Sequence, residues 1–366
     1  MSSKSSEINA STPLSEHRLH TYDLLRGIAI LGVISVHVVQ SFPTNYNILD
    51  FLFRLGRFGV QLFFYVSALT MCQMWIKREG ETNPINKFYI RRFLRIAPLF
   101  WLAIPVYLTL SNMVPVGQAT SFINILLVAT FLHGFWPSSI NSIVPGGWSI
   151  AVEMTFYLIF PVLITTIKDR TNVYFYLACT VYFFYTLLAR DFMQGYFEQI
   201  YGGDQGKSII DDFLYLNFFN QFPIFLLGCY LYFSRKKIAL KQHIFRLVVW
   251  ILLATPFAIF LGKGKLNSGI GFLIVYCGIF TFTYMALKAN ISSKPLELLG
   301  KNSYSIYLCH FLVLELIGKT LRLSSGLLDF SIAITLTIIG SYLISMILKR
   351  LVEDNLHILA KFVTTS

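Results

Sequence analysis

Charged side chains are scarce in this chain of 366 residues. Asp, Glu, Lys and Arg together make up 13% of it, whereas a soluble domain carries about 25%. Apolar runs of roughly 17–22 residues recur from residue 24 to residue 348, and each is long enough to cross a bilayer as a helix. The composition excludes an ordinary soluble domain. Because the runs are continuous rather than alternating, they favour an all-α integral membrane bundle over a β-barrel.

Cysteine and acidic residues are also few, and each shortage excludes a class of function. The five cysteines lie within apolar segments and none forms a C-x-x-C pair, so neither a zinc site nor a disulfide framework is indicated, and we expect no metal. Only 18 acidic residues oppose 30 basic ones, which gives a formal net charge of +12. The basic residues cluster in loops between the apolar runs, as in membrane proteins, so we expect no nucleic-acid partner.

The apolar runs predict about ten transmembrane helices with both termini in the cytoplasm. In this topology most basic loops, including residues 77–95 and 235–241, lie inside, and the acidic loop of residues 191–212 lies outside. A further apolar piece, 122–135, is short for a span, and counting it as one would reverse the charge asymmetry, so we expect it not to span. The expected spans are 24–42, 58–76, 96–111, 147–167, 173–190, 213–233, 244–262, 269–287, 303–318 and 330–348.

We expect a tail on each side of this membrane domain. Residues 1–20 are rich in Ser and Thr and lack an apolar core, so we expect a disordered cytoplasmic tail rather than a signal peptide. Residues 21–356 form the membrane domain, and 357–366 are expected to be a second cytoplasmic tail.

Two ionisable residues stand inside the first apolar run. Arg26 and His37 share one helix face about 16 Å apart along the axis, and Asp23 lies near the same face. Ionisable groups in hydrocarbon are costly, so they indicate a functional site by default. The plainer interpretation is that Arg26 extends to the cytoplasmic interface; His37 is too deep for that and suits proton transfer.

Three further polar groups stand out along the chain. Glu153 lies at a depth similar to His37, in the outer half of the bundle, and needs a partner or a proton. His310 enters from the cytoplasmic side, and its plainer interpretation is a hydrogen bond to a neighbouring helix. Arg92 and Arg95 are one helical turn apart before the third span; they predict either a phosphate clamp or ordinary positive-inside anchoring.

Taken in order, these segments resemble the acyltransferase-3 family of integral membrane acyltransferases, from Tyr22 to about Leu356. The opening DLLRGIAILGVISVH, the second-helix GVQLFFYVSALT and IRRFLRIAPLFW are similar to successive family motifs. So are GGWSIAVEMTFYLIFP, LGKNSYSIYLCHF and LVEDNLH. Gln61, Ala68 and Asn355 depart from the usual acidic, Gly and Pro residues, which leaves the subfamily and the acceptor open. The motifs add Ser149, Tyr157, Ser303 and Tyr304 to the candidate site residues.

The resemblance implies an O-acyltransferase, usually an O-acetyltransferase, of the bacterial cytoplasmic (inner) membrane. Its donor would be cytoplasmic acyl-CoA, used as a co-substrate with no permanently bound cofactor. Its acceptor would be a hydroxyl of a cell-envelope glycan, such as a polysaccharide, a lipopolysaccharide or a lipid-linked glycan. Many relatives carry an extracytoplasmic hydrolase-like domain; this chain ends soon after its last span, so we expect the membrane domain to act alone or with a partner protein.

On this interpretation Arg92 and Arg95, with Arg26 nearby, hold the phosphates of the donor. His37 accepts the proton of the hydroxyl or carries the acyl group, and Glu153 orients His37 or the sugar. Two other classes remain open from the sequence. A proton-coupled transporter or flippase would use Arg26, His37 and Glu153 as a proton relay, and a structural partner in polymer assembly would tolerate changes at His37.

Overall fold

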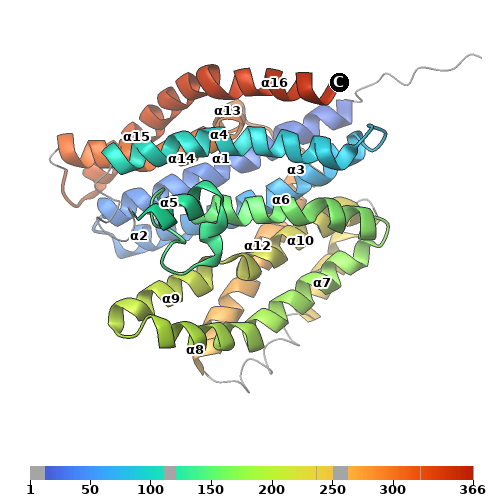
Figure 1. The fold of residues 1–366 in the computed structure, drawn as a ribbon, viewed down its shortest axis with the longest axis horizontal. Coiled ribbons are helices and arrows are strands. Elements are labelled where there is room, and N and C mark those ends of the chain that lie inside the picture. The colour runs from blue at the N-terminus through green and yellow to red at the C-terminus, as the bar shows by residue number, and fades with distance from the viewer. Residues whose placement is uncertain (1–12, 111–120, 236, 250–262, 322, 366) are drawn as a thin grey trace, which may run out of the picture.

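The structure is a computed structural model that describes residues 13–110, 121–235, 237–249, 263–321 and 323–365. Throughout these ranges the regular elements are helical, as the sequence predicts (Figure 1). The longer helices are α1 (Pro13–Ser41), α3 (Gly59–Lys77), α4 (Pro84–Leu110), α6 (Gly147–Ile167), α10 (Phe218–Ser234), α12 (Lys263–Ala289), α14 (Ser303–Thr320) and α15 (Leu327–Leu348). The shorter ones are α2 (Asn47–Arg54), α5 (Phe122–Ala129), α7 (Thr171–Phe184), α8 (Arg190–Ile200), α9 (Asp204–Leu216), α13 (Lys294–Lys301), α16 (Asp354–Thr365) and a helix over 240–249.

Short segments of other helical types connect several of these helices. Two 3₁₀ turns, η1 (Leu55–Phe58) and η3 (Leu132–Phe135), lie before α3 and after α5. Two π-helical segments, η4 (Tyr185–Ala189) and η5 (Lys349–Glu353), join α7 to α8 and α15 to α16. A π-helical turn inserts an extra residue and turns the side chains that follow onto a different face.

Six helical stretches within the described ranges are long and apolar enough to cross a membrane. They are His20–Ser41, Asn47–Lys77, Pro84–Leu110, Gly147–Ile167, Gly206–Ser234 and Leu327–Leu356. These stretches correspond to the expected spans 24–42, 58–76, 96–111, 147–167, 213–233 and 330–348. Expected spans 173–190, 269–287 and 303–318 coincide with α7 and η4, α12 and α14, and most of 244–262 lies outside the described residues. The chain is therefore a helical membrane protein.

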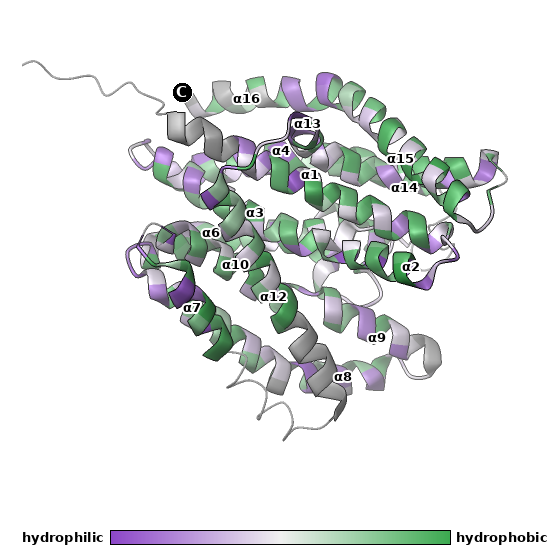
Figure 2. Ribbon diagram, turned by 180° about the vertical axis from the view of Figure 1, so that it is seen from behind, coloured by the Kyte–Doolittle hydropathy of each residue, from purple (hydrophilic) through white to green (hydrophobic). Residues whose placement is uncertain are grey.

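The outer faces of the bundle carry the apolar side chains that lipid requires. Leu158, Val162, Leu316 and Ile347 are each more than half exposed, and hydrophobic residues cover much of the helix surface in Figure 2. A soluble monomer rarely exposes apolar surface on this scale. These faces are consistent with contact to the hydrocarbon of a bilayer.

The piece 122–135 is too short to span, as expected. It contains α5, whose eight residues cover about 12 Å, and the single 3₁₀ turn η3. The hydrocarbon core of a bilayer is about 30 Å thick. Ser121 caps α5 by accepting a hydrogen bond from the Asn124 amide, so the helix begins at a defined residue.

Both expected tails are helical where the structure describes them. α1 begins at Pro13, within the tail expected over 1–20, and 1–12 lies outside the described residues. In the second expected tail, 357–366, residues up to 365 belong to α16, which packs on α4.

One layer of the bundle positions the polar residues. α1 packs against α3, α13, α14 and α15, while α14 also packs on α4, and α4 on α6. Figure 1 shows α1, α4, α6 and α14 running roughly parallel. The α1–α13 contact is close because a Cβ at Gly27 would overlap the Leu296 carbonyl, and one at Gly300 would overlap the Asp23 carbonyl. Glycine at both positions lets the backbones of the two helices touch beside Arg26.

Candidate functional site: two cavities joined at an arginine pair

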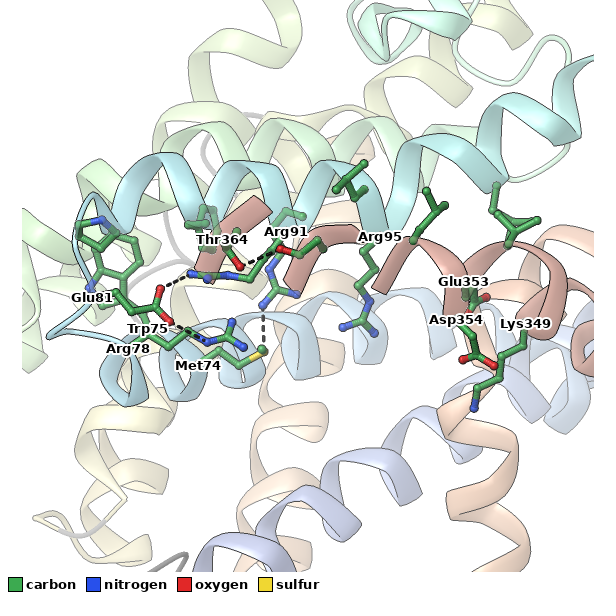
Figure 3. A pocket seen from close by; sticks show the side chains of 18 residues that line it. Met74, Trp75, Arg78, Glu81, Arg91, Arg95, Lys349, Glu353, Asp354 and Thr364 are labelled. Atoms are coloured by element: carbon green, nitrogen blue, oxygen red, sulfur yellow. Dashed lines mark hydrogen bonds and ion pairs between the residues drawn. The ribbon is translucent and has the colours of Figure 1, made fainter. Parts of the chain in front are cut away.

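A cavity of about 600 Å³ lies between the end of α3, the first half of α4 and the η5–α16 segment (Figure 3). The side chains that α16 presents to it, Leu356, Ala360 and Thr364, recur every four residues and so share one helix face. The lining residues are Met74, Trp75, Arg78, Glu81, Pro84, Phe88, Arg91, Arg92, Leu94, Arg95, Leu99, Lys349, Val352, Glu353, Asp354, Leu356, Ala360 and Thr364. The C-terminal helix is therefore a wall of the cavity rather than a free tail.

Cationic side chains outnumber carboxylates in this outer cavity, five to three. Two of the arginines are neutralised by one glutamate: Arg91 contacts Glu81 at 2.7 Å and Arg78 contacts it at 3.5 Å. Burial and the neighbouring Arg91 lower the pKa of Arg78, against the opposing effect of Glu81. The positive charges of Arg78 and Arg91 thus repel each other, and an anion bound in the cavity would reduce this repulsion.

Arg92 is the buried member of the group. Its side chain is 6% exposed, its Nη2 donates to Met74 Sδ at 3.1 Å, and its guanidinium lies 5.6 Å from the ring centres of both Phe88 and Tyr157. Among the described residues no carboxylate lies within ion-pairing distance of it. Arg95, which is exposed, likewise forms no ion pair with a described residue. A buried guanidinium without a carboxylate is costly unless a ligand supplies the negative charge.

A second, inner cavity of about 70 Å³ meets the first at this arginine pair, because Arg92 and Arg95 line both. Its other lining residues are Arg26, Val60, Phe63, Phe64, Ser67, Thr70, Ile96, Ser149, Ile150, Glu153, Tyr157, Ser303, Tyr304 and Tyr307. Five different helices thus supply its walls. Besides the arginine pair, six residues that the sequence offered as candidates line this cavity: Arg26, Ser149, Glu153, Tyr157, Ser303 and Tyr304.

Arg26 points into the bundle. Its Nη1 contacts Asp23 Oδ1 at 3.1 Å, and its Nη2 donates to Thr70 Oγ1 at 2.7 Å. The Thr70 hydroxyl in turn donates to the Val66 carbonyl at 2.7 Å. The guanidinium is therefore held between α1 and α3 at the inner cavity rather than extended to an interface.

Glu153 on α6 is held by two hydroxyl groups. Ser67 donates to its Oε1 at 2.6 Å and Tyr157 donates to the same oxygen at 2.5 Å. Its second carboxylate oxygen remains to accept from a ligand. The sequence analysis expected Glu153 to orient His37 or the sugar; the structure places it with Arg26 on the inner cavity.

Ser149 and Tyr307 join α6 to α14 at the far side of this cavity. The Ser149 hydroxyl lies 2.9 Å from the Tyr307 hydroxyl, and Tyr307 donates to the Gly146 carbonyl at 3.0 Å. Gly146 has a φ of +76°, and a Cβ there would lie 2.6 Å from the Tyr307 hydroxyl, so both space and backbone conformation require glycine. Tyr304, one turn earlier, donates to the Ile96 carbonyl at 2.6 Å and so ties α14 to α4.

His37 and His310 lie apart from the two cavities and in contact with each other. Their ring centres are 5.4 Å apart, and both rings pack on Phe311, at 4.3 Å and 4.2 Å. His37 Nδ1 lies 3.1 Å from Gln40 Oε1. The sequence placed both histidines in the bundle interior, and α1 packing on α14 brings them together.

Some residues of the two cavities gave little signal in the sequence. Ser67 and Thr70 fall in the second-helix motif, yet a lone hydroxyl in an apolar run does not indicate a role. Glu81, Lys349 and Glu353 lie at helix ends, where charged residues are ordinary. The described residues contain no group of three or more His, Cys, Asp or Glu arranged to hold a metal ion.

The fold and the joined cavities define a helical membrane protein with a cavity rich in cationic side chains that meets a smaller inner cavity. Residues 19–346 match the acyltransferase domain family acyltransferase-3, and the chain belongs to that family. It is 24% identical over 329 residues to O-acetyltransferase OatA of Staphylococcus aureus (strain NCTC 8325 / PS 47), covering 81% of this chain and 51% of that protein. It is 25% identical over 327 residues to a putative O-acetyltransferase of Staphylococcus aureus (strain COL), and this match covers 81% of this chain and 50% of that protein. The chain thus spans about half the length of these curated relatives, and no solved structure gives a significant match.

Proposed function

We propose that this protein is a membrane O-acetyltransferase that moves an acetyl group from acetyl-CoA to a hydroxyl of a cell-surface or exported glycan. The observation that carries the proposal is the buried Arg92 guanidinium, which has no carboxylate among the described residues and stands where the two cavities meet. A phosphate group would supply the missing negative charge, and arginine binds phosphate with two parallel hydrogen bonds. Family membership and the names of the relatives support the reaction class.

We further propose that the chain crosses the bacterial cytoplasmic membrane ten times with both termini inside. The four spans beyond the six clear ones would be 173–190, 244–262, 269–287 and 303–318. The positive-inside distribution of the loops supports this topology. It puts the outer cavity, at the cytoplasmic end of α4, within reach of a donor made in the cell.

The two cavities fit the two ends of acyl-CoA. The phosphate-bearing nucleotide would occupy the cavity of about 600 Å³, which carries the excess of cations. The thin pantetheine arm would pass between Arg92 and Arg95, and the acetyl group would enter the inner cavity of about 70 Å³. Arg26, fixed by Thr70, would guide the arm through the inner cavity toward His37, where the transfer would take place.

His37 is proposed to act on the acceptor. It lies three turns further along α1 than Arg26, toward the outer side in the proposed topology. A hydroxyl is a weak nucleophile at neutral pH, so a neutral imidazole that accepts its proton would assist the transfer; His37 could instead carry the acetyl group transiently. Glu153, with one carboxylate oxygen still available, would bind a polar group of the donor or of the sugar.

The proposal is tested with the purified full chain in lipid vesicles, radiolabelled acetyl-CoA and envelope glycans as acceptors. We expect acetyl transfer to a glycan, its loss in His37→Ala, and no requirement for a proton gradient. Mass spectrometry of envelope glycans from cells with and without the protein identifies the sugar that loses an acetyl mass. Activity that depends on a proton gradient and not on acetyl-CoA would overturn the proposal in favour of a transporter.

A further inference from the structure

A row of three rings connects the inner cavity to His37. Tyr307 lines the cavity, its ring centre lies 5.6 Å from that of His310, and His310 lies 5.4 Å from His37. Tyr307 and His310 are three residues apart on α14 and so share one side of the helix. His310 is therefore the link between the cavity and the proposed base, although it touches neither cavity itself.

The hydrogen bonds of His310 fix its tautomer. Its Nδ1 lies 2.7 Å from the Tyr307 carbonyl oxygen, which only accepts, so Nδ1 carries the proton. The Nε2 atom is then an acceptor, and it is buried without a hydrogen-bond partner in the described part of the chain. The side chain as a whole is 0% exposed. A buried acceptor without a partner is uncommon, because the atom loses its water and gains nothing in return.

His37 also has a ring nitrogen that can accept a hydrogen bond. Its Nδ1 faces Gln40 Oε1 at 3.1 Å, so with the amide oriented as placed, Nδ1–H donates and Nε2 is free to accept. The two rings therefore offer two acceptor nitrogens and no proton between them. At this ring separation one added proton is within reach of both imidazoles, directly or through one water.

The other groups around His310 do not compete for that proton. On α14 itself its titratable neighbours are Tyr307, which donates to Gly146, Cys309, whose thiol donates to the Ser341 carbonyl of α15, and Glu315, which pairs with Lys319. From α4, Tyr107 donates to the Leu308 carbonyl. The remaining titratable group in ring contact with His310 is His37 of α1.

We propose that His310 is a positioning residue for the transfer reaction: it accepts a hydrogen bond from His37 after His37 has taken the proton of the acceptor hydroxyl. This inference rests on the proposed function. In the transfer, the hydroxyl O–H and the thioester C–S bonds break and the ester C–O bond forms. The pair holds the hydroxyl proton as a single positive charge until the proton passes to the CoA thiolate, which leaves as the thiol. Two cationic imidazoles so close together repel, so the pair titrates as one unit.

The test compares His310→Asn with wild type in the acetyl-transfer assay across pH. The Asn amide nitrogen can occupy the place of Nδ1 and donate to the Tyr307 carbonyl, but nothing replaces Nε2. We expect kcat to fall about 10- to 100-fold with the KM for acetyl-CoA unchanged. The acid limb of the kcat profile moves to lower pH, because protonated His37 has lost the acceptor that stabilises it. A purely structural role would lower the amount of folded protein without moving that limb.

His243→Asn is the matched control. His243 is also buried, also has one bonded nitrogen, with Nδ1 3.0 Å from the Tyr230 hydroxyl, and also has an unpartnered Nε2 among the described residues. It packs on Phe280 and Tyr284, away from His37. We expect the kcat profile of His243→Asn across pH to match that of the wild type.

A folded His310→Asn variant with the wild-type rate and pH profile would overturn the inference, and the proposed function would stand if His37→Ala were still inactive. Absence of any acetyl transfer by wild type would overturn both. If His310→Asn does not fold, His310→Gln is measured in its place, because its longer side chain also lacks a neutral ring nitrogen that accepts. A folded Gln variant with the wild-type rate and pH profile would contradict the inference.

Discussion

The Arg26 guanidinium on α1 donates a 2.7 Å hydrogen bond to the Thr70 hydroxyl on α3, inside the bundle and on the wall of the inner cavity. A cation in this position has lost most of its water and depends on fixed polar neighbours. Asp23, one turn before it on α1, supplies the matching charge. Arg26 is therefore held in one direction, as a group that guides the donor through this cavity would be.

Removing the hydroxyl that holds Arg26 should reduce turnover. We expect Thr70→Val to lower the transfer rate roughly 10- to 100-fold, because a hydrogen bond to a charged group contributes about 1.5–3 kcal/mol. Thr70→Ser keeps the hydroxyl and should stay within about threefold of wild type. Steady-state transfer rates and thermal unfolding in lipid measure both variants. Equal rates for the Val and Ser variants would show that Thr70 does not hold Arg26 for catalysis.

The inner cavity should limit the length of the acyl group. With about 70 Å³ it admits a few non-hydrogen atoms, and Phe63, packed edge-on to Tyr307 at 6.3 Å, closes one side. We expect wild type to use acetyl-CoA in preference to butyryl-CoA. Phe63→Ala should shift the kcat/KM ratio toward butyryl-CoA by about 10- to 200-fold, the range for one or two methylenes in an apolar pocket.

The matched control for Phe63 is Phe53→Ala, an aromatic residue that packs on Phe330 outside the cavity. It should leave the ratio of butyryl to acetyl transfer unchanged. A wild-type protein that transfers butyryl as fast as acetyl would show that this cavity does not hold the acyl group.

Glu297 should make stability depend on acid pH. Burial raises the pKa of this carboxyl, but hydrogen bonds from Ser292, His20 and the Ser293 amide outweigh it and lower the pKa below its ordinary 4.5. A lowered folded pKa means that the carboxylate stabilises the protein above about pH 4.5, and that this stability is lost as pH falls through the folded pKa. Glu297 lies in the first turn of α13, next to Leu296, whose backbone packs against Gly27 of α1. Loss of this carboxylate should therefore destabilise the contact between α13 and α1.

We therefore expect Glu297→Gln to be about 1–3 kcal/mol less stable than wild type at pH 7. The difference in melting temperature should shrink as pH falls below about 4.5. Glu79→Gln removes the partner of Lys168 in a largely exposed pair and should leave the melting temperature nearly unchanged. A pH-independent difference between Glu297→Gln and wild type would contradict the assignment of the effect to this carboxylate.

The sequence predicts single helices well and their contacts poorly. Span 147–167 coincides with α6, because its apolar run ends at a charged residue and begins after a double glycine. Arg26 and His37 fall on one helix, α1, as their spacing indicates. The 122–135 segment, expected not to span from its length and the loop charges, contains the eight-residue α5 and one 3₁₀ turn.

Contacts between distant segments were not readable in the same way. Nothing in the local pattern shows that His310 meets His37, because hydrophobic periodicity gives a buried face and not the partner of that face. The position of residues 357–366 after the last span suggested a tail, and nothing in the local pattern shows that α16 packs on α4. That helix, through Leu356, Ala360 and Thr364, forms a wall of the outer cavity.

Acetyl-CoA binding to the full chain in lipid nanodiscs tests the central claim most directly, with wild type, Arg92→Met and Arg235→Met measured by titration. Arg235 is the matched control: it also has one neutral partner, Tyr22, and lies over an aromatic ring, Tyr232, but it lines neither cavity. We expect Arg92→Met to weaken binding about 10- to 150-fold, which corresponds to the 1.5–3 kcal/mol of a charged hydrogen bond, and Arg235→Met to bind like wild type. Unchanged affinity in a folded Arg92→Met protein would contradict the account.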